Sequence, residues 1–156
     1  MRPVIFILVL IVQIQNVHSQ SLDAYKLYNS EGDELSFNQL TKELRKADVV
    51  FFGEQHNNPI CHWMQLELLK ALDSKEDIVL GAEMFESDDQ LVLNEYLNGK
   101  MKLERLKEEA KLWSNYKTDY APLVEYAKEN QLRFIATNIP KRYASLVSKE
   151  GQAALL

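Results

Sequence analysis

An apolar run at residues 49–52 constrains the fold of this chain most strongly. The run has no alternation with polar residues, which is typical of a parallel strand covered on both faces. Gly53-Glu54-Gln55-His56 follows it, and Asn58-Pro59 then provides a helix N-cap and a first helical residue. We therefore expect a strand, a turn and a helix. Glu54 and His56 would lie at the carboxyl end of the strand, where open α/β sheets bind ligands.

Two further apolar segments, residues 78–82 and 132–136, extend this pattern. Amphipathic helical patterns separate the three segments, and successive βα units favour a parallel sheet with right-handed crossovers. The connection between the second and third segments is longer than one crossover helix requires and contains three helical patterns. The predicted fold class is therefore α/β, a parallel sheet flanked by helices, with a small helical insertion at about residues 87–131.

The N-terminus has the features of an export signal. Arg2 supplies a positive charge, residues 4–12 are apolar, and small residues lead to a cleavage site after Ser19. The apolar run is shorter than the roughly 20 residues that a membrane span requires. We predict a signal peptide at residues 1–19 and an exported protein. The single cysteine, Cys61, lies far beyond the cleavage site, so no lipid-acceptor cysteine is seen.

Residues 20–156 contain enough apolar residues for one α/β domain, since 46% of the chain is hydrophobic. Residues 151–156 resemble the beginning of a helix that stops. We therefore expect the chain to be a C-terminally truncated part of a longer domain. The formal net charge of −5 does not suggest nucleic acid as a partner.

Polar side chains follow each of the three predicted strands. Carboxyl ends of parallel strands share one edge of a sheet, so we expect these side chains to converge there. The residues concerned are Glu54 and His56, Glu83 and Glu86, and Asn138, Arg142 and Tyr143.

Glu54, His56 and Glu83 are types of residue that bind divalent metals or act as a base with an orienting acid. An alternative is that His56 only caps a turn. An unpaired carboxylate directly after a buried strand is costly, so Glu83 is expected to pair with Arg142 or Lys141, or to bind a ligand.

Several tyrosines in the second half of the chain have two interpretations. Tyr120 fits the apolar face of a helix and is expected to pack in the core. A phenolate can also ligate ferric haem, and a neighbouring cation can pair with a haem propionate. Tyr143 has that combination, beside Lys141 and Arg142. His62 lies off the apolar stripe of its helix, which predicts a position at the surface or behind the site.

Four blocks occur in an order that resembles the ChaN-like haem-binding family, which is related to the Tiki/TraB and erythromycin-esterase-like proteins. The resemblance extends from about Phe37 to the end of the chain. It implies a parallel α/β domain with a small helical domain. The blocks are Phe52-Gly53-Glu54-Gln55-His56-Asn57-Asn58-Pro59, Ala82-Glu83-Met84-Phe85-Glu86, Trp113-x-x-Tyr116-x-x-x-Tyr120-Ala121-Pro122-Leu123 and Ala136-Thr137-Asn138-Ile139-Pro140-Lys141-Arg142-Tyr143-Ala144.

The resemblance implies an exported, periplasmic or outer-membrane-associated protein that binds haem for iron uptake. It also implies a homodimer with haems between subunits, and an outer-membrane haem-uptake machinery as partner. The residues assigned to haem binding are Tyr143, Arg142, His56 and Asn138. The family uses a tyrosine as iron ligand; Tyr143 is the candidate here, and the alternative is a tyrosine beyond residue 156. This interpretation assigns no catalytic residue.

The Tiki-type relatives imply a competing function, an extracytoplasmic metal-dependent hydrolase. Gly53 and His56 match their Gly-x-x-His element, and Glu83 matches a glutamate element. In that alternative, Glu54, His56 and Glu83 would bind a divalent metal and carry the catalysis. A third interpretation is a non-catalytic fragment with an incomplete ligand site.

Overall fold

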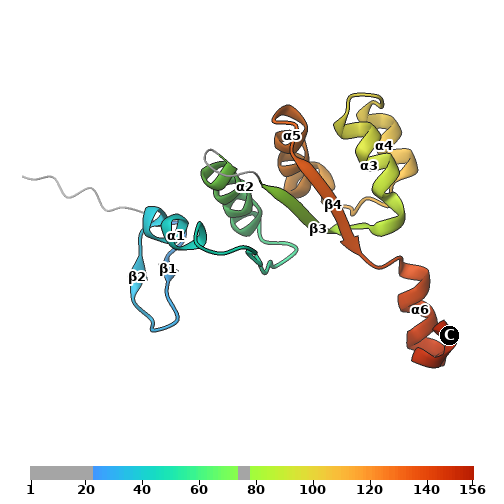
Figure 1. Ribbon diagram of the computed structural model, residues 1–156, viewed down its shortest axis with the longest axis horizontal. Helices are drawn as coiled ribbons and strands as arrows, with labels where there is room; N and C mark the ends of the chain where they lie inside the picture. Colours follow the sequence, from blue (N-terminus) through green and yellow to red (C-terminus); the bar gives the residue numbers. More distant parts are fainter. Residues whose placement is uncertain (1–22, 74–77) are drawn as a thin grey trace, which may run out of the picture.

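The protein is described by a computed structural model that covers residues 23–73 and 78–156. The predicted signal peptide lies outside these residues. The described chain begins with a short antiparallel hairpin, β1 (Leu27–Tyr28) and β2 (Glu34–Leu35), and continues into α1 (Phe37–Leu44) and α2 (Pro59–Asp73) (Figure 1). Helix α2 begins at the predicted residue because the Asn58 side chain accepts hydrogen bonds from the amides of Ile60 and Cys61, at 3.0 and 3.3 Å.

The central sheet consists of the parallel strands β3 (Val79–Glu86) and β4 (Arg133–Asn138). Between them lie η1 (Ser87–Asp89), α3 (Gln90–Leu97), α4 (Leu103–Glu109), the π-helical turn η2 (Tyr116–Tyr120) and α5 (Ala121–Glu129). After β4 come α6 (Lys141–Glu150) and η3 (Gln152–Leu155). The predicted α/β class with a parallel sheet flanked by helices is confirmed, and helices form in all three predicted stretches between the two strands.

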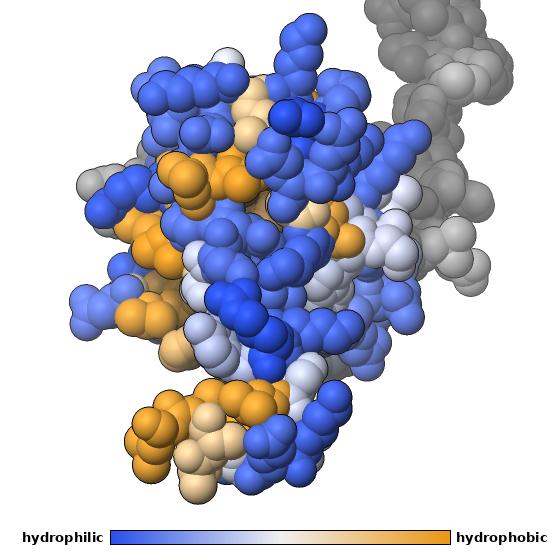
Figure 2. Space-filling view, turned by 90° about the vertical axis from the view of Figure 1, so that its right-hand side faces the viewer, coloured by the Kyte–Doolittle hydropathy of each residue, from blue (hydrophilic) through white to orange (hydrophobic). Residues whose placement is uncertain are grey.

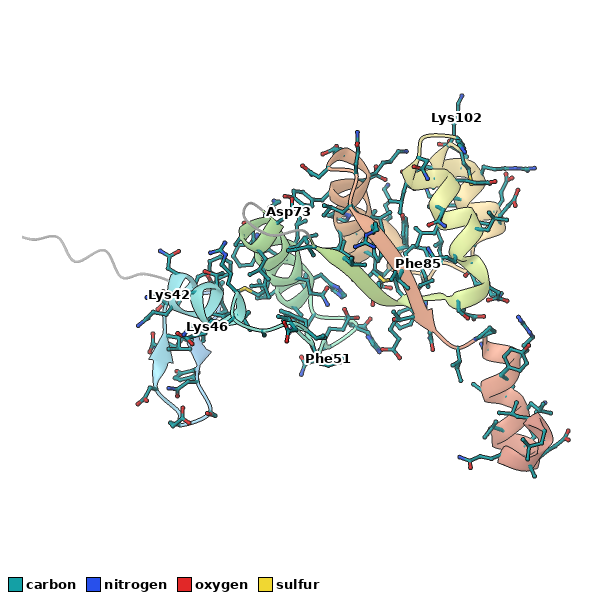
Figure 3. The ribbon with its side chains drawn as sticks, in the orientation of Figure 1. Lys42, Lys46, Phe51, Asp73, Phe85 and Lys102 are labelled. Carbon is teal, nitrogen blue, oxygen red and sulfur yellow. The ribbon has the colours of Figure 1, made fainter. Side chains whose placement is uncertain are left out.

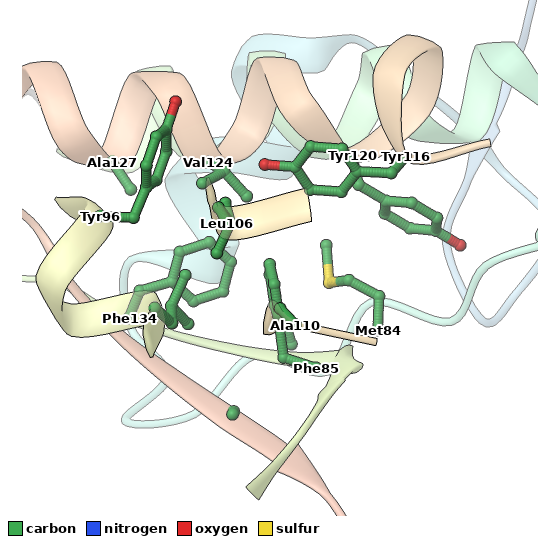
Figure 4. Close-up of a cluster of buried hydrophobic side chains, with 13 residues drawn as sticks. Met84, Phe85, Tyr96, Leu106, Ala110, Tyr116, Tyr120, Val124, Ala127 and Phe134 are labelled. Atoms are coloured by element: carbon green, nitrogen blue, oxygen red, sulfur yellow. The ribbon is translucent and has the colours of Figure 1, made fainter. Parts of the chain in front are cut away.

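The core lies on one face of this sheet, between the strands and helices α3 to α5 (Figure 4). Phe85, Leu106 and Val124 are fully buried there. The opposite face is open, because Val79 and Ile135 remain 39% and 49% exposed. An apolar run thus shows that a strand is hydrophobic, but not that layers cover both of its faces.

The predicted strand at residues 49–52 does not form. This segment has no ladder partner among the described residues, and its side chains face solvent: Val49 is 66% and Phe51 94% exposed. Figure 3 shows Phe51 below α2 and β3, in the part of the picture between the β1–β2 hairpin and α6. A strand needs a hydrogen-bonded neighbour, and the free energy of apolar burial cannot be gained where no neighbouring layer covers the segment.

Helix α1 begins with the predicted capping box. The Ser36 side chain accepts a hydrogen bond from the Gln39 amide at 3.3 Å, and the Gln39 side chain accepts one from the Ser36 amide at 2.8 Å. Ser36→Ala is expected to lower the free energy of unfolding by about 1 kcal/mol in urea denaturation. Ser30→Ala, in the exposed hairpin turn, is the control and should change it little. Equal effects of the two substitutions would contradict the assigned cap.

Helix α6 projects from the body of the molecule, at the lower right of Figure 1, and has no buried residue. Figure 2 shows this side of the molecule, where hydrophobic residues gather at the end of the C-terminal segment. Among the described helices, none combines the length and apolar composition needed to cross a membrane.

Candidate functional site

The Glu54 carboxylate is the centre of a polar cluster between the loop that precedes α2, helix α2 itself and the π-helical turn η2. It accepts hydrogen bonds from the Tyr120 hydroxyl at 2.6 Å and the Gln65 amide at 2.7 Å. Its side chain is 16% exposed. Burial raises the pKa of this carboxyl, but hydrogen bonds from Tyr120, His56 and Gln65 outweigh that effect and hold its pKa below the ordinary 4.5.

The His56 imidazole is presented to solvent at the edge of this cluster. Its Nδ1 lies 2.8 Å from a Glu54 oxygen, and its side chain is 53% exposed. The Trp113 ring contacts it edge-on, with ring centroids 4.8 Å apart. Because a carboxylate can only accept, Nδ1 carries the proton and Nε2 of the neutral ring keeps its lone pair. His56 therefore offers a nitrogen that can contact a ligand.

His62, which the sequence placed at the surface or behind the site, is buried behind Glu54. Its side chain is 4% exposed, with Nδ1 3.6 Å from Glu54 and Nε2 3.7 Å from Asp119. The Tyr120 ring packs edge-on against it at 4.7 Å between centroids. No role was predicted for Asp119, and Tyr120 was expected to pack in the core. In the sequence, only the block that contains Trp113, Tyr116 and Tyr120 indicated that the segment around η2 belongs to the site.

A second polar network forms at the carboxyl ends of β3 and β4, where Glu86 lies opposite Asn138 in the ladder. Glu86 accepts from the Lys111 ammonium at 2.7 Å and from the Lys141 amide at 3.0 Å. The Lys111 hydrogen bond lowers the pKa of Glu86. The predicted convergence of these two strand ends is confirmed. The connection from Lys111 to η2 joins this network to the Glu54 cluster.

The expected pairing of Glu83 with Arg142 or Lys141 is wrong. Arg142 pairs with Asp88, whose carboxylate is held at the start of η1, and the Lys141 amide binds Glu86. Glu83 is exposed on the open face of the sheet, because side chains alternate along β3 and its neighbours Ala82 and Met84 point into the core.

The described residues contain no group of three or more His, Cys, Asp or Glu side chains that is arranged to hold a metal ion. Glu54 and His56 are brought together, whereas the hydrogen bonds found around Glu54 do not include Glu83. The divalent-metal alternative stays a prediction.

Tyr143 lies near the start of α6 and is 44% exposed. The guanidinium carbon of Arg142 lies 4.7 Å from the centroid of its ring, which is a cation–π contact. Ile139, just before the helix, is 58% exposed. A phenol, an apolar side chain and two basic residues therefore gather within five residues of chain, beside the second polar network.

The fold defines a class of protein: a parallel α/β domain with one polar network at the carboxyl ends of β3 and β4 and a second polar cluster around Glu54. Residues 40–156 match the family described as "Haem-binding uptake, Tiki superfamily, ChaN". The chain belongs to this ChaN family, which confirms the resemblance carried by the four sequence blocks.

Two known proteins are similar to the chain. The structure described as cofacial haem binding to ChaN of Campylobacter jejuni superposes with a TM-score of 0.65 at 21% sequence identity, over 78% of this chain and 51% of that one. This likeness concerns the fold. Protein RETICULATA-RELATED 5, chloroplastic, of Arabidopsis thaliana is 29% identical over 118 residues, which are 70% of this chain and 16% of that protein. The chain thus spans about half of the solved structure and a small part of the plant protein.

Proposed function

We propose that the chain binds haem, as part of an exported protein for haem and iron uptake. The observation that carries the proposal is the family match, which extends over residues 40–156 and therefore includes both polar networks and α6. The solved relative supports it, because that protein shares the fold and binds haem cofacially.

The residues near the start of α6 fit the chemical demands of an iron porphyrin. The macrocycle needs apolar contact surface, which the exposed Ile139 provides. The propionates need cations, and Lys141 and Arg142 supply them; Arg142 contacts Asp88 but has further N–H donors. Bound ferric haem would supply a Lewis-acidic iron, which a phenolate such as that of Tyr143 can ligate.

His56 and Asn138 belong to the same proposal as flanking groups. His56 offers a side-chain nitrogen at the surface, and Asn138 ends β4 beside Glu86. We extend the proposal to a homodimer with haem between the subunits, because cofacial haem binding is described for the Campylobacter protein. We also propose that the protein lies in the periplasm or at the outer membrane. Its partner there would be an outer-membrane haem-uptake machinery.

Titration of the purified full chain with hemin tests the proposal. Wild-type protein is expected to develop a Soret band with the charge-transfer bands of a tyrosinate-ligated ferric haem. Tyr143→Phe should lose those charge-transfer bands, because a phenyl ring has no oxygen to bind iron. Tyr28→Phe is the matched control, an exposed tyrosine in the hairpin that should bind as wild type. A wild-type chain with no spectral change at micromolar hemin would refute haem binding. Unchanged bands in Tyr143→Phe would refute Tyr143 as the ligand.

A further inference from the structure

We propose that His62 is a positioning residue for His56: it fixes the main chain and the side chain of His56 so that Nε2 faces a ligand. The proposal rests on the proposed function only for the identity of that ligand, haem. His62 lies on α2, where its side chain is only 4% exposed, and it contacts the loop that contains His56.

The main chain of His56 is held by two hydrogen bonds. Its carbonyl oxygen accepts a hydrogen bond from His62 Nε2 at 3.0 Å and a second one from the Asn115 amide at 2.8 Å. One donor comes from α2 and the other from the residue before η2. The loop is therefore held from two sides at the residue whose imidazole is presented.

The side chain of His56 is also connected to His62. Its orientation depends on Glu54, whose first oxygen binds His56 Nδ1 and whose second oxygen lies 3.6 Å from His62 Nδ1. His62 therefore acts on both groups that hold His56, the carbonyl of the residue itself and the carboxylate that binds its ring.

Hydrogen-bond acceptors surround the His62 ring. On its Nε2 side lie the His56 carbonyl and the Asp119 carboxylate, and on its Nδ1 side lies Glu54. All of these groups are acceptors. Nδ1 is buried and makes no hydrogen bond, so its nearest electrostatic partner is the Glu54 oxygen. The ring must therefore carry a proton on Nε2, and a second proton on Nδ1 would place a positive charge between two carboxylates.

This arrangement has the form seen around metal-binding histidines, where a carboxylate fixes the tautomer of the ligand and further groups orient that carboxylate. Here Glu54 has the first role, and His62, Tyr120 and Gln65 surround Glu54. Removing such groups typically lowers metal affinity by about 10- to 100-fold. His56 is a flanking group in the proposed haem site and Tyr143 is the iron ligand, so we expect a smaller effect, about 10-fold at most, on hemin affinity when His62 is lost.

The test begins on the ligand-free full chain. Nitrogen-15 NMR of the ring nitrogens is expected to show His56 as a single Nδ1–H tautomer and His62 protonated at Nε2. A His62 ring without a proton on Nε2 could not donate to the His56 carbonyl, and this result would overturn the proposal. This measurement does not depend on haem.

Variants of His62 then separate positioning from packing. His62→Leu is expected to give mixed His56 tautomers and to lower hemin affinity by up to about 10-fold. His62→Gln can still donate from its amide to the His56 carbonyl and should restore most of the affinity. Lys70→Gln, at an exposed position of the same helix, is the control.

Each outcome has a distinct meaning. A folded His62→Leu chain with an unchanged His56 tautomer and unchanged hemin affinity would overturn the proposal. If His62→Leu does not fold, the proposal is tested by the hemin affinity of His62→Gln and by the protonation of the ring nitrogens in the wild-type protein. If wild-type protein binds no hemin, the proposed function fails, and the tautomer of His56 in the variants still decides whether His62 positions it.

Discussion

Phe85→Ala is expected to lower the free energy of unfolding by about 3 to 5 kcal/mol, the largest effect of any substitution considered. Phe85 is fully buried at the centre of the core, and its ring centroid lies 5.9 Å from that of Phe134 and 6.3 Å from that of Tyr116. Truncation would remove apolar contacts with the sheet and with η2, and it would leave a cavity that the surrounding side chains can fill only in part. Urea denaturation measures the effect.

Phe51→Ala is the matched control, because it makes the same chemical change at a side chain that is 94% exposed. We expect it to change the free energy of unfolding by no more than about 0.5 kcal/mol. The comparison also tests whether residues 49–52 are exposed in solution. A large loss of stability in Phe51→Ala would mean that this segment is buried in solution, as the sequence first suggested.

Glu54→Gln is expected to lower the free energy of unfolding by about 1 to 3 kcal/mol at neutral pH. The glutamine keeps the shape of the side chain but loses the negative charge. In the wild type, the charged carboxylate accepts hydrogen bonds from Tyr120, Gln65 and His56. Because an amide offers one oxygen where the carboxylate offers two, at least one buried donor loses its acceptor. Glu108→Gln, an exposed ion-pair partner on α4, should have little effect.

The contribution of Glu54 to the free energy of unfolding is expected to depend on pH. The pKa of Glu54 is lower in the folded chain than its ordinary 4.5, so the unfolded chain binds the proton first as the pH falls. The stabilisation by Glu54 is complete above pH 4.5 and is lost as the pH falls through the lower folded-state pKa. The difference in stability between wild type and Glu54→Gln should therefore shrink in acid. A difference that is constant between pH 7 and pH 3 would contradict the assigned hydrogen bonds.

Sequence patterns predicted correctly those helices and strands that are determined by residues close together in the chain. The Ser36–Gln39 capping box and the Asn58 N-cap set the beginnings of α1 and α2, and both hydrogen-bond as expected. The two apolar segments that became β3 and β4 lie in the predicted parallel order. The parallel pairing of these two strands was predictable because helices connect them and return the chain to the same end of the sheet.

Contacts between distant segments were not predictable in the same way. Tyr120 fits an apolar helix face, and nothing in its own segment shows that its hydroxyl reaches Glu54. The burial of His62 depends on η2 packing over α2, which periodicity within α2 cannot reveal. Residues 49–52 were predicted as a buried strand from hydrophobicity alone, and hydrophobicity does not show whether a neighbouring strand is present.

The central claim, haem binding at the carboxyl edge of the sheet, is tested most directly by mapping the porphyrin on the chain. Gallium protoporphyrin is diamagnetic, so its ring current can be followed in amide spectra of the full chain. The predicted result is that shifts concentrate at residues 53–58 and 138–143, around His56 and Tyr143. A hollow of about 630 Å³ beside α4, lined by Lys102 and Arg105 among others, is the internal control; Lys102 is labelled at the upper border of Figure 3. Shifts confined to that hollow, or no shifts at all, would contradict the account.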